Sequence, residues 1–208
     1  MESVTYKSAE LFLIFILAPI SFVLNFSIWV KVSLGLFGFL YVIFVLLRVE
    51  KKAFKIASNL NWKRFWIQTF YKLVVVVIVT SLYMWVVDKA HMFEVLRNKP
   101  LLWLGILFVY SLFSVYPQEL IYRTFFFKRY ENLFKSEYIL IFVNAIVFSL
   151  AHLFFYKSLV LILTFLGGIL FAWTYKKTSS TLLVSIEHAI YGCWLFTVGM
   201  GNMLGFPS

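Results

Sequence analysis

Seven long apolar runs dominate the sequence and constrain its fold more than any other feature. A helix that crosses the hydrocarbon core of a bilayer needs about 20 mostly apolar residues, because each residue advances the helix by about 1.5 Å. The runs show no polar–apolar alternation of the kind that indicates strands. The sequence therefore predicts an all-α, polytopic transmembrane helix bundle of about seven spans, with a range of about six to eight. The expected spans are Leu11–Val30, Val32–Leu47, Leu73–Val87, Leu101–Phe127, Tyr138–Phe155, Leu159–Tyr175 and Leu182–Met200.

The composition leads to the same class of protein. Of the 208 residues, 62% are hydrophobic and 13% are charged, whereas a soluble domain carries about 25% charged residues. This excess of apolar residues excludes an ordinary soluble globule, a disordered chain and a disulfide-stapled secreted module. We expect residues 1–208 to form a single integral membrane domain. The one cysteine, Cys193, has no second cysteine with which to form an intramolecular disulfide.

Lys and Arg residues are distributed unevenly between the predicted loops, within a net charge of +10. Most of them fall at the N-terminus and in the loops after the second, fourth and sixth spans. Because basic loops face the cytoplasm, we expect a plasma (inner) membrane protein whose N-terminus is cytoplasmic. The basic and aromatic segment Lys51–Lys72 is expected to anchor the third span at the lipid interface. Nothing else in the sequence favours nucleic-acid binding, so membrane lipid is the predicted partner of this segment.

Polar side chains inside apolar runs are the best candidates for function, because a charge at bilayer depth is costly unless it is paired or faces a cavity. At about 1.5 Å per residue, Glu119, His152 and His188 lie about 16 Å, about 21 Å and about 10 Å from the cytoplasmic ends of their helices. One carboxylate and two imidazoles are therefore predicted to meet around a cavity that opens to the cytoplasm. The full set is Gln118, Glu119 and Arg123 in the fourth span, Asn144 and His152 in the fifth, and Glu187 and His188 in the seventh.

Several of these residues also have a structural interpretation. Glu119 and Arg123 are spaced i, i+4 and can form an ion pair. Each histidine and Asn144 can make hydrogen bonds between helices, and Glu187 can be a structural or cavity-lining group. Pro117 lacks an N–H, so we expect it to kink the fourth helix or to start a new helical segment.

At these residues the chain resembles the CPBP family of intramembrane proteases, which includes CaaX prenyl endopeptidases and bacteriocin-processing or bacteriocin-immunity proteins. The resemblance covers roughly residues 101–201, which it marks as the catalytic core. Two family positions differ: Gln118 replaces the glutamate usually assigned as base, and Gly192 replaces an asparagine or aspartate. The family motif E-E-x-x-x-R reads Gln118-Glu119-Leu120-Ile121-Tyr122-Arg123, F-x-x-x-H reads Phe148-Ser149-Leu150-Ala151-His152, and H-x-x-x-N or H-x-x-x-D reads His188-Ala189-Ile190-Tyr191-Gly192.

The resemblance implies an endopeptidase that cleaves a peptide bond of a membrane-associated protein or peptide. Such a reaction needs a base that activates water and donors that stabilise the oxyanion. We expect Glu119 to be the base, His152 to position the water and His188 to donate to the oxyanion. The supporting residues would be Gln118 as a further N–H donor, Asn144 in place of the missing asparagine, and Arg123 beside Glu119 or a substrate carboxylate.

Three alternatives remain open at this stage. Glu119, His152 and His188 form a possible zinc-binding set, but a liganding Glu119 leaves no evident base, so metal-free glutamate chemistry is favoured and no cofactor is expected. A catalytically inactive CPBP homologue, acting as a membrane binding or bacteriocin-immunity protein, would account for Gln118 and Gly192. A proton-coupled transporter would use the same buried groups as a relay, but the chain lacks paired broken segments in two matching halves.

Overall fold

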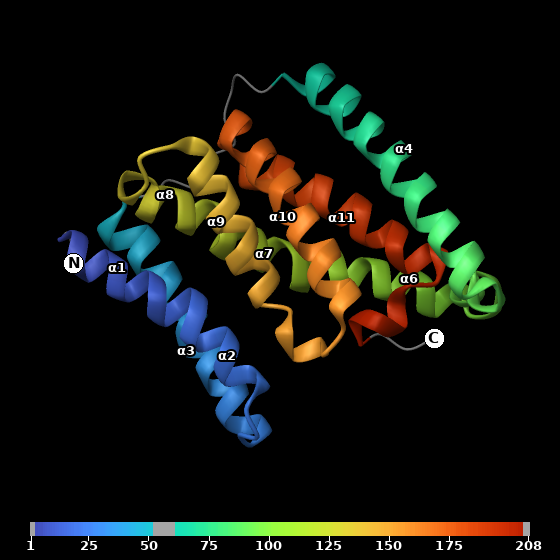
Figure 1. The fold of residues 1–208 in the computed structure, drawn as a ribbon, viewed down its shortest axis with the longest axis horizontal. Coiled ribbons are helices and arrows are strands. Elements are labelled where there is room, and N and C mark those ends of the chain that lie inside the picture. The colour runs from blue at the N-terminus through green and yellow to red at the C-terminus, as the bar shows by residue number, and fades with distance from the viewer. Residues whose placement is uncertain (1–2, 52–60, 206–208) are drawn as a thin grey trace. The chain divides into compact units, whose positions relative to one another are not determined.

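The computed structural model describes residues 3–51 and 61–205, without the side chain of Leu204, and all regular secondary structure in these ranges is helical (Figure 1). Seven helical segments are long and apolar enough to cross a membrane, which confirms the predicted all-α polytopic fold. The protein is therefore a multi-pass integral membrane protein. Lys52, Phe54 and Lys55 of the predicted interfacial segment lie outside the described residues. The seven segments are Val4–Val23, Ile28–Val49, Trp62–Val87, Pro100–Leu133, Glu137–Phe155, Ser158–Thr178 and Thr181–Val198.

The chain divides into two compact units, each built from two separate stretches of sequence. Unit 1 comprises Met1–Ile56 and Leu120–Ser179, and unit 2 comprises Ala57–Glu119 and Ser180–Ser208. The elements of unit 1 are α1 (Val4–Phe12), the π-helix η1 (Leu13–Leu17), α2 (Ala18–Val23), α3 (Ile28–Phe44), the π-helix η2 (Val45–Val49), the π-helix η5 (Leu120–Phe125), α8 (Phe126–Tyr130), the 3₁₀-helix η6 (Glu131–Leu133), α9 (Glu137–Leu150), the 3₁₀-helix η7 (Leu153–Phe155) and α10 (Ser158–Thr178). Those of unit 2 are α4 (Trp62–Val87), the 3₁₀-helix η3 (Lys89–His91), α5 (Glu94–Asn98), α6 (Pro100–Val109), the π-helix η4 (Tyr110–Val115), α7 (Tyr116–Glu119), α11 (Thr181–Val198) and the 3₁₀-helix η8 (Gly201–Leu204).

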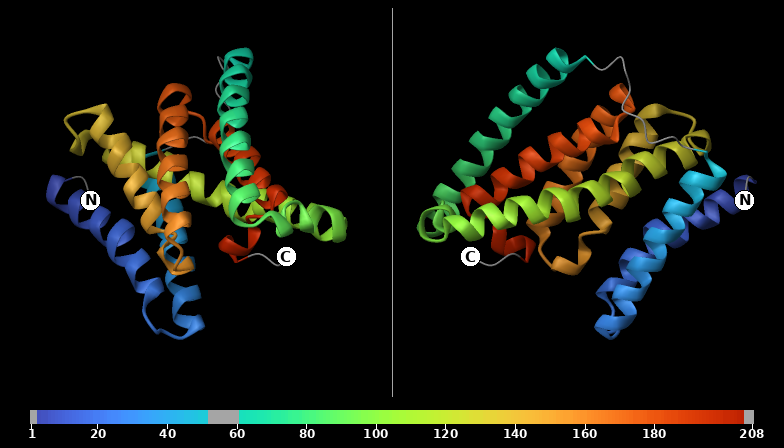
Figure 2. Two further views of the ribbon diagram at one scale, coloured as in Figure 1. Left: turned by 45° about the vertical axis from the view of Figure 1, so that its right-hand side comes forward. Right: turned by 180° about the vertical axis from the view of Figure 1, so that it is seen from behind.

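The first two spanning helices of unit 1 are separated by residues 24–27, and not at Lys31, where the apolar runs Leu11–Val30 and Val32–Leu47 predicted the boundary. The chain reverses there between α2 and α3 (Figure 2). Ser27 ends the turn, because its side chain accepts a hydrogen bond from the backbone N–H of Val30 and so caps α3. Lys31 lies inside α3, and its Nζ donates to the carbonyl oxygen of Phe22 at 2.7 Å. Lys31 thus provides a hydrogen-bond donor for a carbonyl group at the end of α2 and does not interrupt α3.

Replacing Ser27 with alanine is expected to lower the free energy of unfolding by about 1 kcal/mol, because the N–H groups of the first turn of α3 lose their side-chain acceptor. Thermal unfolding in detergent measures the change. Ser33→Ala is the matched control, since Ser33 is an exposed residue within α3. Equal effects of the two substitutions would show that the cap contributes nothing.

A buried cluster of charges joins three segments of unit 1. Arg129 of α8 donates from Nε to Glu10 Oε2 at 2.7 Å and from Nη1 to Glu50 Oε1 at 2.9 Å. The hydroxyl of Tyr130 donates to Glu10 Oε2 at 3.0 Å, and the hydroxyl of Tyr41 also donates to Glu10. Burying charged groups is costly unless each is paired and hydrogen-bonded. The cluster meets this condition and links α1, α3 and the residue after η2 to α8.

In the same unit, α9 and α10 lie side by side (Figures 1 and 2). The contact is close at Gly168, where an added Cβ would lie 3.0 Å from the Cα of Ala145. Small residues allow helix backbones to approach one another in membrane proteins, where lipid provides little driving force for association. Gly168 and Ala172, both buried on α10, form such a small-xxx-small pair.

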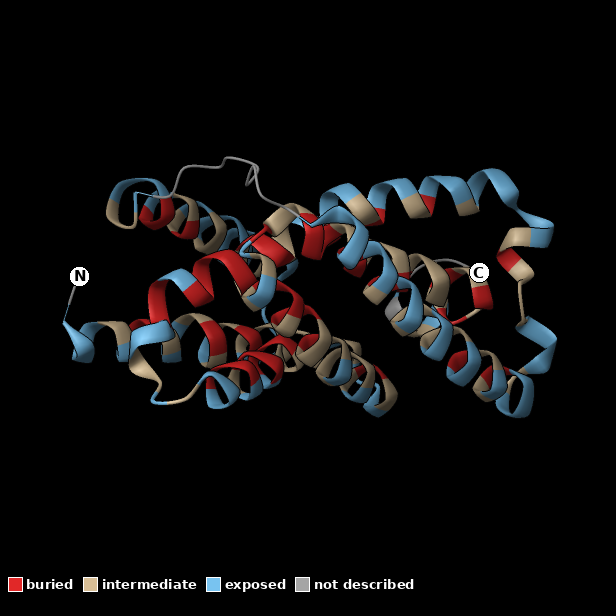
Figure 3. Cartoon of the chain, turned by 90° about the horizontal axis from the view of Figure 1, so that it is seen from above, coloured by how far each residue is buried: buried red, intermediate tan, exposed pale blue. Residues whose placement is uncertain are grey.

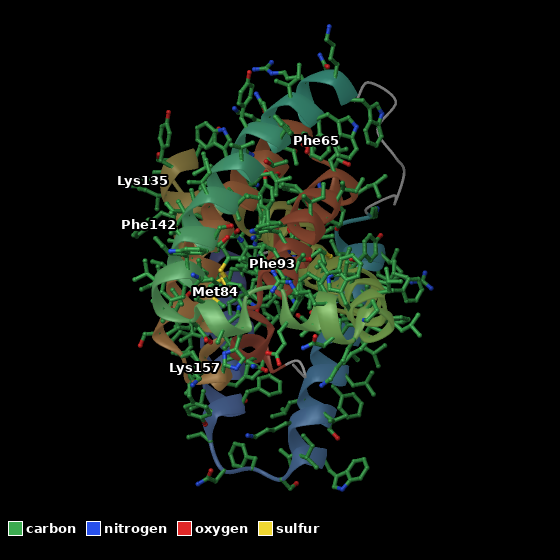
Figure 4. The ribbon with its side chains drawn as sticks, turned by 90° about the vertical axis from the view of Figure 1, so that its right-hand side faces the viewer. Phe65, Met84, Phe93, Lys135, Phe142 and Lys157 are labelled. Carbon is green, nitrogen blue, oxygen red and sulfur yellow. The ribbon has the colours of Figure 1, made fainter. Side chains whose placement is uncertain are left out.

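In unit 2, α4 packs against α11 along a narrow stripe. The buried residues of α4 are Phe65, Thr69, Thr80 and Met84, and most of the helix is exposed or intermediate (Figure 3). Phe65 and Met84 mark the two ends of the stripe (Figure 4). Trp194 of α11 donates from its indole nitrogen to the Thr80 hydroxyl at 2.9 Å. The exposed remainder of α4 is largely apolar, as expected for a helix surrounded by lipid.

The loop after α4 is fastened to the end of α11. Gly199 has a φ of +110°, and an added Cβ would lie 2.4 Å from the carbonyl oxygen of His91. A glycine is required here because the backbone conformation is left-handed and the contact is tight. The backbone N–H of Phe93 donates to the carbonyl of Val198 at 3.4 Å. His91 itself is exposed, and its Nδ1 is hydrogen-bonded to Asp88.

The pKa of His91 is raised above its usual value of 6.5, first by the hydrogen bond to Asp88 and its charge, with a smaller contribution from the charge of Glu94. We expect this contact to stabilise the loop fully below pH 6.5 and to lose its effect as the pH rises through the elevated value. Titration of the imidazole resonances by NMR measures the shift. Asp88→Asn is expected to lower the pKa of His91 toward 6.5; an unchanged pKa in this variant would contradict the assignment to Asp88.

Candidate active site

The fourth spanning helix, Pro100–Leu133, brings Glu119 to the site. The helix continues through Pro117, although proline removes a backbone donor. The sequence predicts a kink or a new helical segment at Pro117. The structure shows a change of helix type instead, with the π-helical turns η4 and η5 before and after the short α7. Such turns are rare and occur frequently at functional sites. Glu119, the last residue of α7, is fully buried.

Glu119 and His188 are brought together within unit 2. The Nδ1 of His188, on α11, lies 2.7 Å from Glu119 Oε1. A carboxylate accepts hydrogen bonds, so we assign Nδ1 as the donor in this contact. His188 is itself 7% exposed. A buried carboxylate in contact with an imidazole is an arrangement that can hold and move a proton.

His152 lies at the end of a helix in unit 1, whereas the sequence analysis placed it inside the fifth helix. α9 ends at Leu150, where the backbone hydrogen bonds no longer join residues four positions apart. The N–H of His152 donates instead to the carbonyl of Ser149, three residues earlier, at 2.9 Å. The imidazole Nδ1 lies 2.8 Å from the carbonyl oxygen of Phe148, four residues earlier. A carbonyl oxygen only accepts, so Nδ1 carries the hydrogen and replaces the backbone donor that a continued helix would supply.

The three supporting residues lie in buried or half-buried positions with local contacts. In unit 2, the side-chain amide of Gln118 donates to the Ser114 hydroxyl at 2.7 Å. In unit 1, the amide of Asn144 donates to the carbonyl oxygen of Tyr122. Arg123, also in unit 1, is fully buried, with its guanidinium carbon 4.5 Å from the ring centroid of Phe148. These contacts fix the orientation of each side chain within its own unit.

Glu187 faces a different helix from its neighbour His188, as their adjacent positions on one helix predict. Its Oε1 accepts a hydrogen bond from Lys72 Nζ at 2.6 Å and another from the Tyr191 hydroxyl at 2.8 Å. Tyr191 also contacts the carbonyl oxygen of Thr69 at 3.2 Å. This network joins α11 to α4 and supports the structural interpretation of Glu187.

Tyr110 is a residue that the sequence analysis missed. An added Cβ at Gly192 would lie 2.0 Å from the Tyr110 hydroxyl oxygen, so the phenol occupies the space next to this position. The Tyr110 ring also packs edge-on to His188, with centroids 6.1 Å apart. Tyr110 lies within an apolar run and belongs to no motif. The absence of a side chain at Gly192 was the available signal, but it does not reveal which residue fills the space.

The contact between Glu119 and His188 in unit 2 bears on how these two residues could ligate zinc. A histidine that ligates zinc commonly donates its other ring nitrogen to a carboxylate, which then orients the ring and is not itself a ligand. The hydrogen bond between His188 Nδ1 and Glu119 has this form. In that arrangement Nε2 of His188, and not Glu119, would be the ligand atom of the pair. Two ligands from Glu119 and His188 together therefore do not fit the arrangement in unit 2.

Comparison with known proteins supports the resemblance seen in the motifs. Residues 100–194 match the family model described as type II CAAX prenyl endopeptidase Rce1-like, which includes all three motif segments. No curated protein and no solved structure matches the chain. The match confirms, over this segment, the predicted similarity to CPBP-family proteases and favours a CAAX-type intramembrane protease fold.

Proposed function

We propose that the protein is an intramembrane endopeptidase that hydrolyses a peptide bond of a membrane-associated protein or peptide. The observation that carries the proposal is the buried contact between Glu119 and His188, at 2.7 Å, within the segment that matches the family model. Ionisable groups at bilayer depth are costly and are typically retained for function. The replacement of the first motif glutamate by Gln118 leaves Glu119 as the carboxylate of that motif.

In the proposed mechanism Glu119 is the general base. It takes a proton from a water molecule whose oxygen attacks the scissile carbonyl carbon, and later gives that proton to the leaving nitrogen as the C–N bond breaks. His188, held through Nδ1, donates from Nε2 to the oxyanion when the ring carries both protons. His152 positions the water through Nε2, because its Nδ1 is engaged by the carbonyl of Phe148. In unit 2, Gln118 would support the site from its position next to Glu119. Arg123 and Asn144 of unit 1 would have the supporting roles that the family resemblance implies.

We propose that the chemistry is metal-free. Glu119 serves as a base in this scheme, and its hydrogen bond to His188 is consistent with a proton-transfer pair. If zinc were bound in unit 2, Nε2 of His188 would be a ligand atom, and the ion would supply a Lewis acid and an activated water. Treatment of the purified protein with a chelator is expected to leave cleavage unchanged. Loss of cleavage that added zinc restores would overturn this part of the proposal.

The substrate is expected to reach the site from the cytoplasmic side. We place the protein in the plasma (inner) membrane with a cytoplasmic N-terminus, on the distribution of Lys and Arg. A prenylated CaaX protein and an unmodified peptide precursor are both substrates of suitable chemistry. The inactive homologue that binds a membrane partner is the second candidate, and the replacements at Gln118 and Gly192 favour it.

The decisive experiment compares cells that carry the wild-type protein, Glu119→Gln or Glu187→Gln. Both variants neutralise a fully buried carboxylate of unit 2 with an amide of the same shape. Mass spectrometry of the membrane proteome is expected to find cleavage products with new C-termini in wild-type and Glu187→Gln cells. Glu119→Gln is expected to reduce their formation by about 10²–10⁴-fold, the contribution of a general base.

The amount of folded protein in each strain is the control for the comparison. Products that persist in Glu119→Gln cells would remove Glu119 from the mechanism. If no product depends on Glu119 and the wild-type protein is present and folded, the endopeptidase proposal fails, and the binding protein becomes the better account.

A further inference from the structure

Position 192 of α11 lacks a side chain, and an aromatic hydroxyl from another helix takes its place. An added Cβ at Gly192 would lie 2.0 Å from the Tyr110 hydroxyl oxygen and 2.4 Å from two carbon atoms of its ring. Contacts this short do not occur between real atoms, so a side chain at residue 192 and the phenol of Tyr110 exclude one another. The absence of a side chain is therefore a condition for the position of Tyr110.

The phenol is held firmly in this position. Tyr110 belongs to a buried apolar cluster with Val95, Ile106, Val115 and Phe196. Its ring packs edge-on against Phe196, with centroids 4.7 Å apart. A buried aromatic ring confined on several sides has little rotational freedom, so its hydroxyl is directed at one place. That place is the surface of α11 at residue 192.

The ring of Tyr110 lies next to His188, one member of the Glu119–His188 pair. Gly192 follows His188 by four residues, so the two positions are on the same face of α11, one helical turn apart. The Tyr110 ring is 6.1 Å from that of His188, measured between centroids.

The π-helical turn η4 explains how one helix presents both Tyr110 and Glu119 to α11. Residues nine positions apart in an α-helix point in opposite directions, since each residue turns the chain by about 100°. A π-helix has wider turns, and η4 covers residues 110–115 between the two side chains. The smaller rotation per residue moves Tyr110 toward the face that carries Glu119.

We propose that Tyr110 is a catalytic residue whose hydroxyl donates a hydrogen bond to the oxyanion of the tetrahedral intermediate, next to His188. The proposal rests on the endopeptidase function proposed above. The hydroxyl donates without transferring its proton: the proton of the attacking water goes to Glu119 and then to the leaving nitrogen. In this view Gly192 is not a lost functional position, since it makes room for a donor supplied by another helix.

The test uses the purified protein and, as probe, the membrane precursor whose cleavage depends on Glu119 in the cell experiment. Tyr110→Phe keeps the ring and removes the hydroxyl. We expect kcat to fall about 10²–10³-fold, as for loss of one oxyanion donor, with little change in KM and no change in the thermal midpoint. Tyr110→Phe activity within about twofold of the wild type, in a preparation that Glu119→Gln inactivates, would overturn the proposal.

A rescue experiment distinguishes a donor from a residue that only fills space. Gly192→Asn alone is expected to lower activity, because the phenol blocks the new side chain. Tyr110→Leu removes the atoms nearest to residue 192 and also lowers activity. The double variant Tyr110→Leu/Gly192→Asn is expected to be about tenfold or more active than Tyr110→Leu, because the asparagine amide supplies a donor in the vacated space.

The outcomes separate the two proposals. A folded double variant no more active than Tyr110→Leu would count against a donor at this position. If the double variant does not fold, Tyr110→Phe decides alone, since it leaves the packing intact. Absence of any Glu119-dependent product in the wild type rejects the endopeptidase function itself, which is a different result from a fully active Tyr110→Phe.

Discussion

Replacing Glu10 with alanine is expected to lower the free energy of unfolding by about 3–5 kcal/mol, the cost of breaking a buried ion pair. Glu10 accepts hydrogen bonds from Arg129, Tyr130 and Tyr41 in unit 1. Without it, the buried guanidinium of Arg129 loses its contact at 2.7 Å, and two phenols lose their acceptor. Thermal or denaturant unfolding in detergent measures the effect.

Glu50→Ala is the matched control for this prediction. Glu50 contacts the same arginine at 2.9 Å, but its side chain is 12% exposed, compared with 4% for Glu10. We expect the control to cost less than half as much, because a more exposed carboxylate contributes less to stability. Equal effects of the two variants would contradict the view that Glu10 is the centre of the cluster.

The second large effect is expected at the ion pair between Lys72 and Glu187 in unit 2. Lys72→Met leaves the fully buried Glu187 without its cation, which is expected to cost about 3–5 kcal/mol. Glu187→Gln is expected to cost less, because the Lys72 side chain is 23% exposed and its long stem lets the ammonium reach the surface. The order of the two thermal midpoints in detergent is the measurement.

A double variant checks the physical reason for this difference. Lys72→Met/Glu187→Leu removes both charges and fills their space with apolar side chains. Buried ion pairs are often replaced in this way without loss of stability, so we expect the double variant to be more stable than Lys72→Met alone. A double variant as unstable as the sum of the single changes would show that the charges contribute independently.

Much of the fold follows from the apolar runs, because lipid requires every backbone polar group to be satisfied within a helix. The runs do not show where helices end. Hydropathy placed the first boundary at Lys31, but the cap of Ser27 and the contact from Lys31 to Phe22 place it earlier. His152 likewise ends its helix through a side-chain contact that no pattern in the sequence reveals.

The candidate site could be predicted in part for a similar reason. Glu119 and His188 stand out in the sequence because ionisable residues are rare in apolar runs, and in unit 2 they are in contact. The partners of Glu187 and Gly192 could not be foreseen. Lys72 was counted as a loop residue, and Tyr110 is one aromatic residue among many. Contacts between residues this far apart in the chain depend on how the helices pack.

The hydrogen bond from His152 to the carbonyl of Phe148 separates the two tasks of one imidazole. The ring nitrogen Nδ1 satisfies the carbonyl at the end of α9, and this contact fixes the orientation of the ring. Asparagine at this position would place an amide donor near the same carbonyl and offer no basic nitrogen. His152→Asn therefore separates the structural contact that ends α9 from the proposed positioning of the water.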